Sequence, residues 1–160
     1  MMHNSKYEIK DPKKILEIIS SCKVIRLALS DTNAPYIVPL NFGYEFQENQ
    51  LYFYMHGASE GKKVDLIRNK PVVGFEMDSR HSLVTADLAC SHTYYYASII
   101  GYGQAELLSD PADKRHGLDK IMDNISPDSP KNYNDKTVTA TSVFRITVHE
   151  YSVKSNIPAK

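Results

Sequence analysis

The segment from His56 to Lys63 brings together the residues of this chain that are best suited to bind an anion. It reads His-Gly-Ala-Ser-Glu-Gly-Lys-Lys and joins an aromatic, strand-like run to a helical pattern. The N–H groups at a helix start are unpaired and carry partial positive charge, and Gly61 lets a ligand approach them closely. The two lysines add positive charge at the same place. The segment therefore predicts a small site for a phosphate monoester, with a solvated charged helix end as the alternative from the residues alone.

Two glycine patterns in the chain do not match nucleotide-binding motifs. The gap from Gly57 to Gly61 is one residue short of a Walker loop, and Lys63 stands where that loop needs Ser or Thr. The pair Gly101-x-Gly103 lacks the third glycine and the following helix of a dinucleotide fingerprint. We interpret it as a strand bulge, and we do not expect hydrolysis of a nucleoside triphosphate.

Cysteine and histidine are too scattered to form a recognisable metal or nucleophile motif. Cys90 and His92 could join a metal site only with distant partners such as His56 and His81, and no paired Cys or His motif occurs. No Gly-x-Ser-x-Gly elbow is present either. We expect no metal, two reduced thiols at Cys22 and Cys90 and no hydrolase triad; the roles of Cys90 and His92 stay open.

Length and composition are those of an ordinary globular domain, and we expect one domain over residues 1–160. The 19 Lys and Arg residues balance 19 Asp and Glu residues, which argues against a nucleic-acid partner. No signal core is present, and no apolar run reaches the roughly 18 residues that a membrane span needs, so we expect a cytoplasmic location. The 11 tyrosines suggest half-buried rings at a wet edge or at an interface.

Hydrophobic periodicity predicts a mainly β fold with flanking helices. Asp11-Pro12 and Asp110-Pro111 are typical helix starts, and Asn69-Lys70-Pro71 is a typical helix end. We expect helices over about 12–22 and 60–69 and from 110 onward, followed by an exposed loop or lid over 126–141. The expected strands, mainly antiparallel, cover 23–30, 35–46, 51–56, 72–78, 93–109 and 142–154.

Three of these strands carry further information. Apolar side chains recur at period two along 35–46, which predicts one strand with 51–56 as its hairpin partner. Pro39 removes a ladder donor and therefore indicates a sheet edge, a bulge or an interruption where a ligand can sit. The nearly continuous apolar run of 23–30 favours a strand covered on both faces.

Four linked motifs of this chain resemble the nitroimidazole-resistance (Nim-type) family of the pyridoxamine-phosphate-oxidase-like FMN-binding split barrels. The motifs lie in the expected order and are Pro35–Tyr44, Leu51–Phe53, His56–Lys63 and Tyr96–Gly103. The resemblance implies a six-stranded antiparallel split barrel that forms a homodimer, with FMN in each of two clefts at the subunit seam. The full substrate-binding pattern of pyridoxamine phosphate oxidase itself is not found.

The resemblance also implies which residues contact the cofactor. Gly61, Lys62 and Lys63 would hold the phosphate through backbone and ammonium donors. His56 would lie beside the ring or the substrate and supply or position a proton, with simple cofactor contact or packing as the alternative. Backbone groups of residues 38–41 would line the isoalloxazine edge, and residues of later strands would add contacts. Ser98 and Ile99 could reach the cofactor from the second subunit, or they could be structural strand residues. These further residues are Val38, Pro39, Leu40, Asn41, Ser98, Ile99 and Lys154.

These roles imply an FMN-dependent oxidoreductase. In this hypothesis, reduced FMN passes electrons to a nitroaromatic, 5-nitroimidazole-like or related small acceptor. The alternatives within the superfamily are a pyridoxamine-phosphate-oxidase-like oxidase and a haem-binding or haem-degrading protein. A non-catalytic flavin carrier is the alternative from a different class. The physiological substrate and the electron donor do not follow from the sequence.

Overall fold

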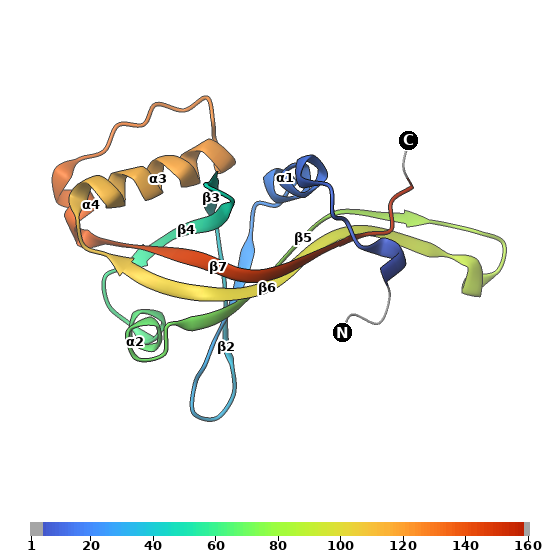
Figure 1. The fold of residues 1–160 in the computed structure, drawn as a ribbon, viewed down its shortest axis with the longest axis horizontal. Helices are drawn as coiled ribbons and strands as arrows, with labels where there is room; N and C mark the ends of the chain where they lie inside the picture. The colour runs from blue at the N-terminus through green and yellow to red at the C-terminus, as the bar shows by residue number, and fades with distance from the viewer. Residues whose placement is uncertain (1–4, 159–160) are drawn as a thin grey trace.

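The computed structural model describes residues 5–158, which form one antiparallel sheet flanked by helices (Figure 1). Two short 3-10 turns, Ser5–Tyr7 and Ala89–Ser91, accompany them. The helices are α1 (Pro12–Ser21), α2 (Lys62–Asn69), α3 (Pro111–Ile125) and α4 (Asp135–Ala140). The strands are β1 (Ile25–Leu29), β2 (Tyr36–Leu40), β3 (Gly43–Gln47), β4 (Gln50–Ala58), β5 (Val72–Val84), β6 (Thr93–Leu108) and β7 (Thr141–Ser155).

The strand order shows that the sheet is curled into a barrel that stays open on one side. The order is β2-β1-β5-β6-β7-β4-β3, so β2 and β3 are the two edges. Only Asn41 and Phe42 separate these edges along the chain. Because three Cα steps span at most about 11 Å, the sheet must curl so that the end of β2 lies near the start of β3. The mainly β split-barrel expectation therefore holds, but the sheet has seven strands and not six.

The extra strand arises because the predicted strand 35–46 is two strands. β2 pairs with β1, while β3 pairs with β4, so the segment changes partner at Asn41–Phe42. Phe42 is fully buried, and Asn41 Nδ2 donates to the carbonyl of Lys23 at 2.8 Å. The period-two pattern continues through this break because Phe42 still points inward, and the sequence pattern therefore hides it. The hairpin partner of 51–56 is β3 alone.

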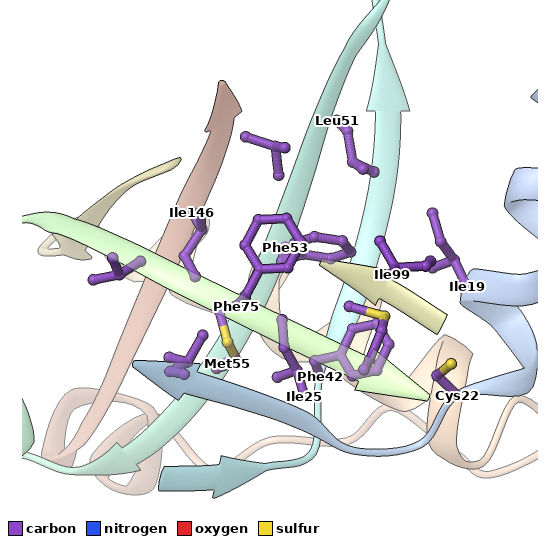
Figure 2. Packing of buried hydrophobic residues seen from close by; sticks show 14 of the residues in the cluster. Ile19, Cys22, Ile25, Phe42, Leu51, Phe53, Met55, Phe75, Ile99 and Ile146 are labelled. Atoms are coloured by element: carbon purple, nitrogen blue, oxygen red, sulfur yellow. The ribbon is translucent and has the colours of Figure 1, made fainter. Parts of the chain in front are cut away.

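The core fills the inside of the curled sheet with interlocking aromatic and aliphatic side chains (Figure 2). Phe53 lies at its centre, with ring centroids 5.6 Å from Phe42 and 5.2 Å from Phe75, both in edge-to-face geometry. Ile19 of α1 and Cys22, the residue that caps the C-terminus of this helix, close one end of this core. Helix α1 starts as predicted, with the Asp11 side chain accepting from the N–H of Lys13.

Other details correct the expectations for individual elements. β1 buries Ile25, Leu27 and Leu29 but exposes Arg26, so in one chain it is covered on a single face. The expected loop 126–141 contains α4, whose Val138 is buried. The register between β6 and β7 shifts at Tyr102/Gly103, which confirms the predicted bulge.

β5 is longer than the predicted 72–78, whereas β6 matches the predicted 93–109 to within one residue. Their ends, Ser82–Val84 and Thr93–Tyr95, pair with each other beyond the rest of the sheet and form a projecting ribbon, seen on the right of Figure 1. The ribbon begins at a bulge between Ser79 and Ser82. Within the described residues, no helix is long and apolar enough to cross a membrane.

Candidate functional site

The N-terminus of α2 forms an open end at which backbone N–H groups are available. β4 ends at Ala58, and three residues later Gly61 takes the N-cap position without a side-chain capping bond. Its φ of 118° belongs to the region that favours glycine. A β-carbon at this position would meet nothing within 4 Å, so the space over the helix end is open. A helix end of this kind favours an anionic ligand.

Lys63 lies half-buried in the first turn of this helix. Its Nζ is 5.6 Å from the ring centroid of Phe144 on β7, and burial lowers the pKa of its ammonium group. No carboxylate oxygen of residues 5–158 lies within 4.0 Å of Lys63 Nζ. A partly desolvated cation without a counter-charge is costly, so an incoming anion would be stabilised here.

Lys62 differs from its neighbour because it already has an anionic partner. Its Nζ lies 2.6 Å from Asp31 Oδ2 in the turn between β1 and β2, and 4.8 Å from the ring centroid of Tyr36. The hydrogen bond between them raises the pKa of Lys62 and lowers the pKa of Asp31. Lys62 therefore fastens α2 to the β1–β2 turn, and Lys63 is the lysine that remains for a ligand.

His56 lies on β4 close to Lys63. It pairs with Val143 of β7 and keeps exposed surface. Partial withdrawal of the ring from water lowers its pKa, and the positive charge of Lys63 lowers it further. The neutral imidazole is therefore favoured at pH 7, with one nitrogen that donates and one that accepts a hydrogen bond.

The free edge of β2 offers backbone groups to a ligand, as the position of Pro39 predicts. β2 is an outer strand, so one row of its N–H and C=O groups has no strand partner within the described chain. Val38 turns its side chain into the core, whereas Pro39 is exposed and Leu40 is half-buried. The Asn41 amide is engaged with Lys23. Any contact of Val38 with a ligand would be made by its backbone.

Ser98, Ile99 and Lys154 lie far from the α2 end in the same chain. Ser98 pairs with Lys154, and Ile99 is fully buried in the core. Phe144, beside Lys63, pairs with Leu107, which is nine residues along β6 from Ser98. At the rise of a β-strand this corresponds to roughly 30 Å along the sheet. One chain thus brings together His56 and the first turn of α2, but it does not bring Ser98, Ile99 or Lys154 to the same place.

The structure adds site residues that the sequence does not reveal. Asp31 and Tyr36 hold Lys62, Phe144 lies under Lys63, and Gly57 leaves room for the Lys63 ammonium. They come from the β1–β2 turn, β2, β7 and β4, which approach α2 only after folding. Gly57 carries the one weak sequence signal, a glycine within a strand.

A polar network beneath α3 supports β4 from the other side. Glu45 of β3 accepts from the hydroxyl of Tyr54 at 2.6 Å and contacts His116 Nε2 at 3.1 Å and Lys120 Nζ at 3.2 Å. Burial alone would raise the pKa of Glu45, but the hydrogen bonds from Tyr54, His116 and Lys120 outweigh it and lower the pKa to about 2. This network fixes α3 to the edge of the barrel, two residues along β4 from His56.

The cysteines and histidines do not gather into a metal site in the described part of the chain. No three His, Cys, Asp or Glu side chains of residues 5–158 are grouped so that they could hold a metal ion. Cys22 is buried and Cys90 is exposed, and both are free thiols. His92 Nδ1 accepts from the N–H of Ala86 within the turn of the ribbon.

Comparison with known proteins agrees with the fold. The model of the pyridoxamine 5'-phosphate oxidase family matches residues 11–155. A candidate 5-nitroimidazole antibiotic resistance protein from Bacteroides thetaiotaomicron is 30% identical, with a TM-score of 0.79 over 92% of this chain and 86% of that chain. A comparison with curated proteins finds no match.

Two further solved structures share the fold at lower identity. The flavocytochrome Anf3 from Azotobacter vinelandii is 21% identical, with a TM-score of 0.79 over 99% of this chain and 73% of that chain. A NimC/NimA family protein from Clostridium acetobutylicum is 16% identical, with a TM-score of 0.55 over 92% and 90%. At these identities the similarity shows a common fold alone.

Proposed function

Because the chain belongs to the pyridoxamine 5'-phosphate oxidase family, we propose that it binds FMN at the N-terminal end of α2 and reduces small electron acceptors. The family membership confirms the resemblance drawn from the four sequence motifs. The observation that carries the proposal is the half-buried ammonium of Lys63, which has no carboxylate partner among residues 5–158 and lies at an uncapped helix start. A phosphate monoester would supply the missing negative charge.

The residues present fit FMN. The Lys63 ammonium and the N–H groups that follow Gly61 would hold the phosphate. Gly61 leaves open space over the helix start, and Gly57 leaves the space that the Lys63 ammonium occupies. The free edge of β2 would offer N–H and C=O groups to the polar ring atoms. Bound FMN would supply the redox chemistry by taking up and releasing electrons. His56 would hold or move a proton at a ring nitrogen beside the acceptor.

The choice of a nitroaromatic or similar acceptor rests on the 30% identical relative, which is assigned to 5-nitroimidazole resistance. Reduction of a nitro group to a nitroso group takes two electrons and two protons and releases water. The neutral state of His56 suits it to relay protons near pH 7. A carrier without this activity would bind the same flavin but would not turn over.

A homodimer would complete the site. The outer sheet face exposes Ile37 (62%), Ile100 (52%) and Tyr102 (44%), which line a groove of about 720 Å³. Exposed apolar surface of this kind is typical of an interface. The face lies between the α2 end and the pair Ser98–Lys154. A second copy on it could therefore bring its own Ser98 and Lys154 to a flavin held by Lys63.

Mixing two inactive variants tests the shared site. Lys63→Glu and Lys154→Glu should each fail to bind FMN as homodimers, because each loses one half of both sites. After the two variants are mixed and exchange subunits, half the dimers should be mixed, and about a quarter of all sites should bind FMN again. No recovery between dimers that demonstrably exchange would contradict the shared site, and a monomer by light scattering would contradict the dimer.

The absorption spectrum tests the cofactor, and reoxidation tests the enzyme. The purified protein, or the protein after FMN addition, should show flavin bands and quench flavin fluorescence. After anaerobic reduction by dithionite, a 5-nitroimidazole should restore the oxidised spectrum faster than it does with free FMN. A Soret band without flavin would contradict FMN in favour of haem, and no acceleration would favour the carrier.

A further inference from the structure

A second groove lies apart from the α2 end, at the base of the ribbon. It is bordered by α1, by the 3-10 turn Ser5–Tyr7 and by the C-terminal residues 155–158. It has a volume of about 630 Å³. Lys6, Lys14 and Arg80 line it together with one acidic residue, Glu17. No carboxylate oxygen of the described residues lies within 4.0 Å of any of the three cationic groups. The groove therefore has an unbalanced positive charge of two.

Arg80 takes an uncommon backbone conformation that directs its side chain to this groove. Its φ is 59°, in the left-handed region that is unfavourable for a residue with a side chain. It lies in the bulge between Ser79 and Ser82, and its Nη2 donates to the carbonyl of Glu17 at 3.1 Å. Bulges re-aim side chains near functional sites, and strain of this kind persists only where the surrounding structure imposes it. The fold thus holds a guanidinium against α1 at a conformational cost.

The groove also has apolar lining, part of which the C-terminal segment carries. Ile9 and Ile157 are half-buried and contribute aliphatic surface, together with the buried Ile18 of α1. The tail that carries Ile157 is anchored because Asn156 accepts from the N–H of Tyr96 at 2.8 Å and donates to the carbonyl of Tyr94 at 2.9 Å. A ligand in this groove would meet both cationic groups and hydrocarbon.

We propose that this groove is a second binding site, which takes a phosphate monoester that carries an apolar group. Such a phosphate has a charge of about −1.5 to −2 near pH 7, which balances the net charge of the groove. The guanidinium of Arg80 and the ammonium of Lys14 would bind the phosphate oxygens, and the isoleucine side chains that line the groove would contact the apolar group. The groove differs from the α2 end in all its residues.

Phenyl phosphate is a suitable probe, and inorganic phosphate and phenol, which represent its two halves, are the comparison ligands. Each ligand is added to the FMN-saturated protein, and its binding is measured by calorimetry. We expect phenyl phosphate to bind more tightly than either half. Lys14→Ala and Arg80→Gly should each weaken its binding about tenfold or more. Lys13→Ala is the control, because it removes the same charge from the neighbouring residue of α1, which does not line the groove. It should change binding less than threefold.

Two further variants separate the possible outcomes. Lys63→Ala should leave phenyl phosphate binding unchanged, because that residue belongs to the α2 end. Arg80→Gly relieves the backbone strain, so its unfolding temperature should fall by no more than about 4 °C while binding is lost. Absence of binding by the wild type, or equal losses in Lys13→Ala and Lys14→Ala, would overturn the proposal. Loss only in Lys63→Ala would place the probe at the α2 end and overturn it as well.

Discussion

The ammonium group of Lys63 occupies the space that a side chain on residue 57 would need. An ideal β-carbon built on Gly57 would lie 2.5 Å from Lys63 Nζ and 3.2 Å from its Cε. The glycine in β4 thus permits the lysine of α2 to lie against the strand, where its positive charge lowers the pKa of the neighbouring residue His56.

Gly57→Ala should displace the ammonium and weaken FMN binding three- to tenfold, which corresponds to about 1 kcal/mol. The methyl group meets only the flexible end of Lys63, so the unfolding temperature should change little. Fluorescence titration measures the affinity of the variant and of the wild type; equal affinity in the two proteins would show that the lysine position does not matter.

His56→Ala should retain FMN with an affinity within about threefold and lose at least tenfold in turnover of the acceptor, since proton transfer by a positioned side chain contributes at least that much. His149→Ala, an exposed histidine on β7, serves as the control. Stopped-flow reoxidation of the reduced protein measures the rate. An unchanged rate in His56→Ala would leave the residue with a packing or binding role only.

The pKa of His56 provides a second measurement on the same residue. It should titrate below an ordinary histidine in the FMN-free protein, because burial and Lys63 disfavour the charged form. An anionic phosphate bound to Lys63 offsets that positive charge, so FMN should raise the pKa of His56. NMR titration of the imidazole with and without FMN tests this, and a downward change would contradict the proximity of the phosphate.

Glu45→Gln should lower the free energy of unfolding by about 1–3 kcal/mol at pH 7, because the charged acceptor of three hydrogen bonds is lost. The pKa of Glu45 is depressed to about 2 in the folded protein, from an ordinary 4.5. Its charge therefore stabilises the fold above about pH 4.5, and this contribution disappears as the pH falls towards 2. Denaturation of both proteins between pH 7 and 2 should show a stability difference that shrinks on acidification. A difference that stays constant would assign the effect to packing.

The sequence predicts local features well because they depend on neighbouring residues. The starts of α1 and α3 follow from Asp-Pro pairs, and the bulge follows from two closely spaced glycines. The break between β2 and β3 escapes prediction because Phe42 preserves the alternation of inward residues across it. The number of strands is wrong for that reason alone.

At the site, the sequence identifies Lys63 but cannot separate it from Lys62. The difference between them is made by Asp31, which lies 2.6 Å from Lys62 only because the β1–β2 turn folds against α2. Local pattern carries no signal for such a pairing. The same holds for Ser98 and Lys154, whose distance from Lys63 within one chain follows from the register of β6 and β7.

The central claim is that Lys63 binds the phosphate of FMN, and the most direct test compares FMN with riboflavin, which lacks the phosphate. The wild type should prefer FMN strongly, and Lys63→Ala should lose at least tenfold of that preference, since a charge-assisted hydrogen bond contributes about 1.5–3 kcal/mol. Lys62→Ala should change it less than threefold, because Lys62 is paired with Asp31. An unchanged preference in Lys63→Ala, or a larger loss in Lys62→Ala, would contradict the assignment of the phosphate to Lys63.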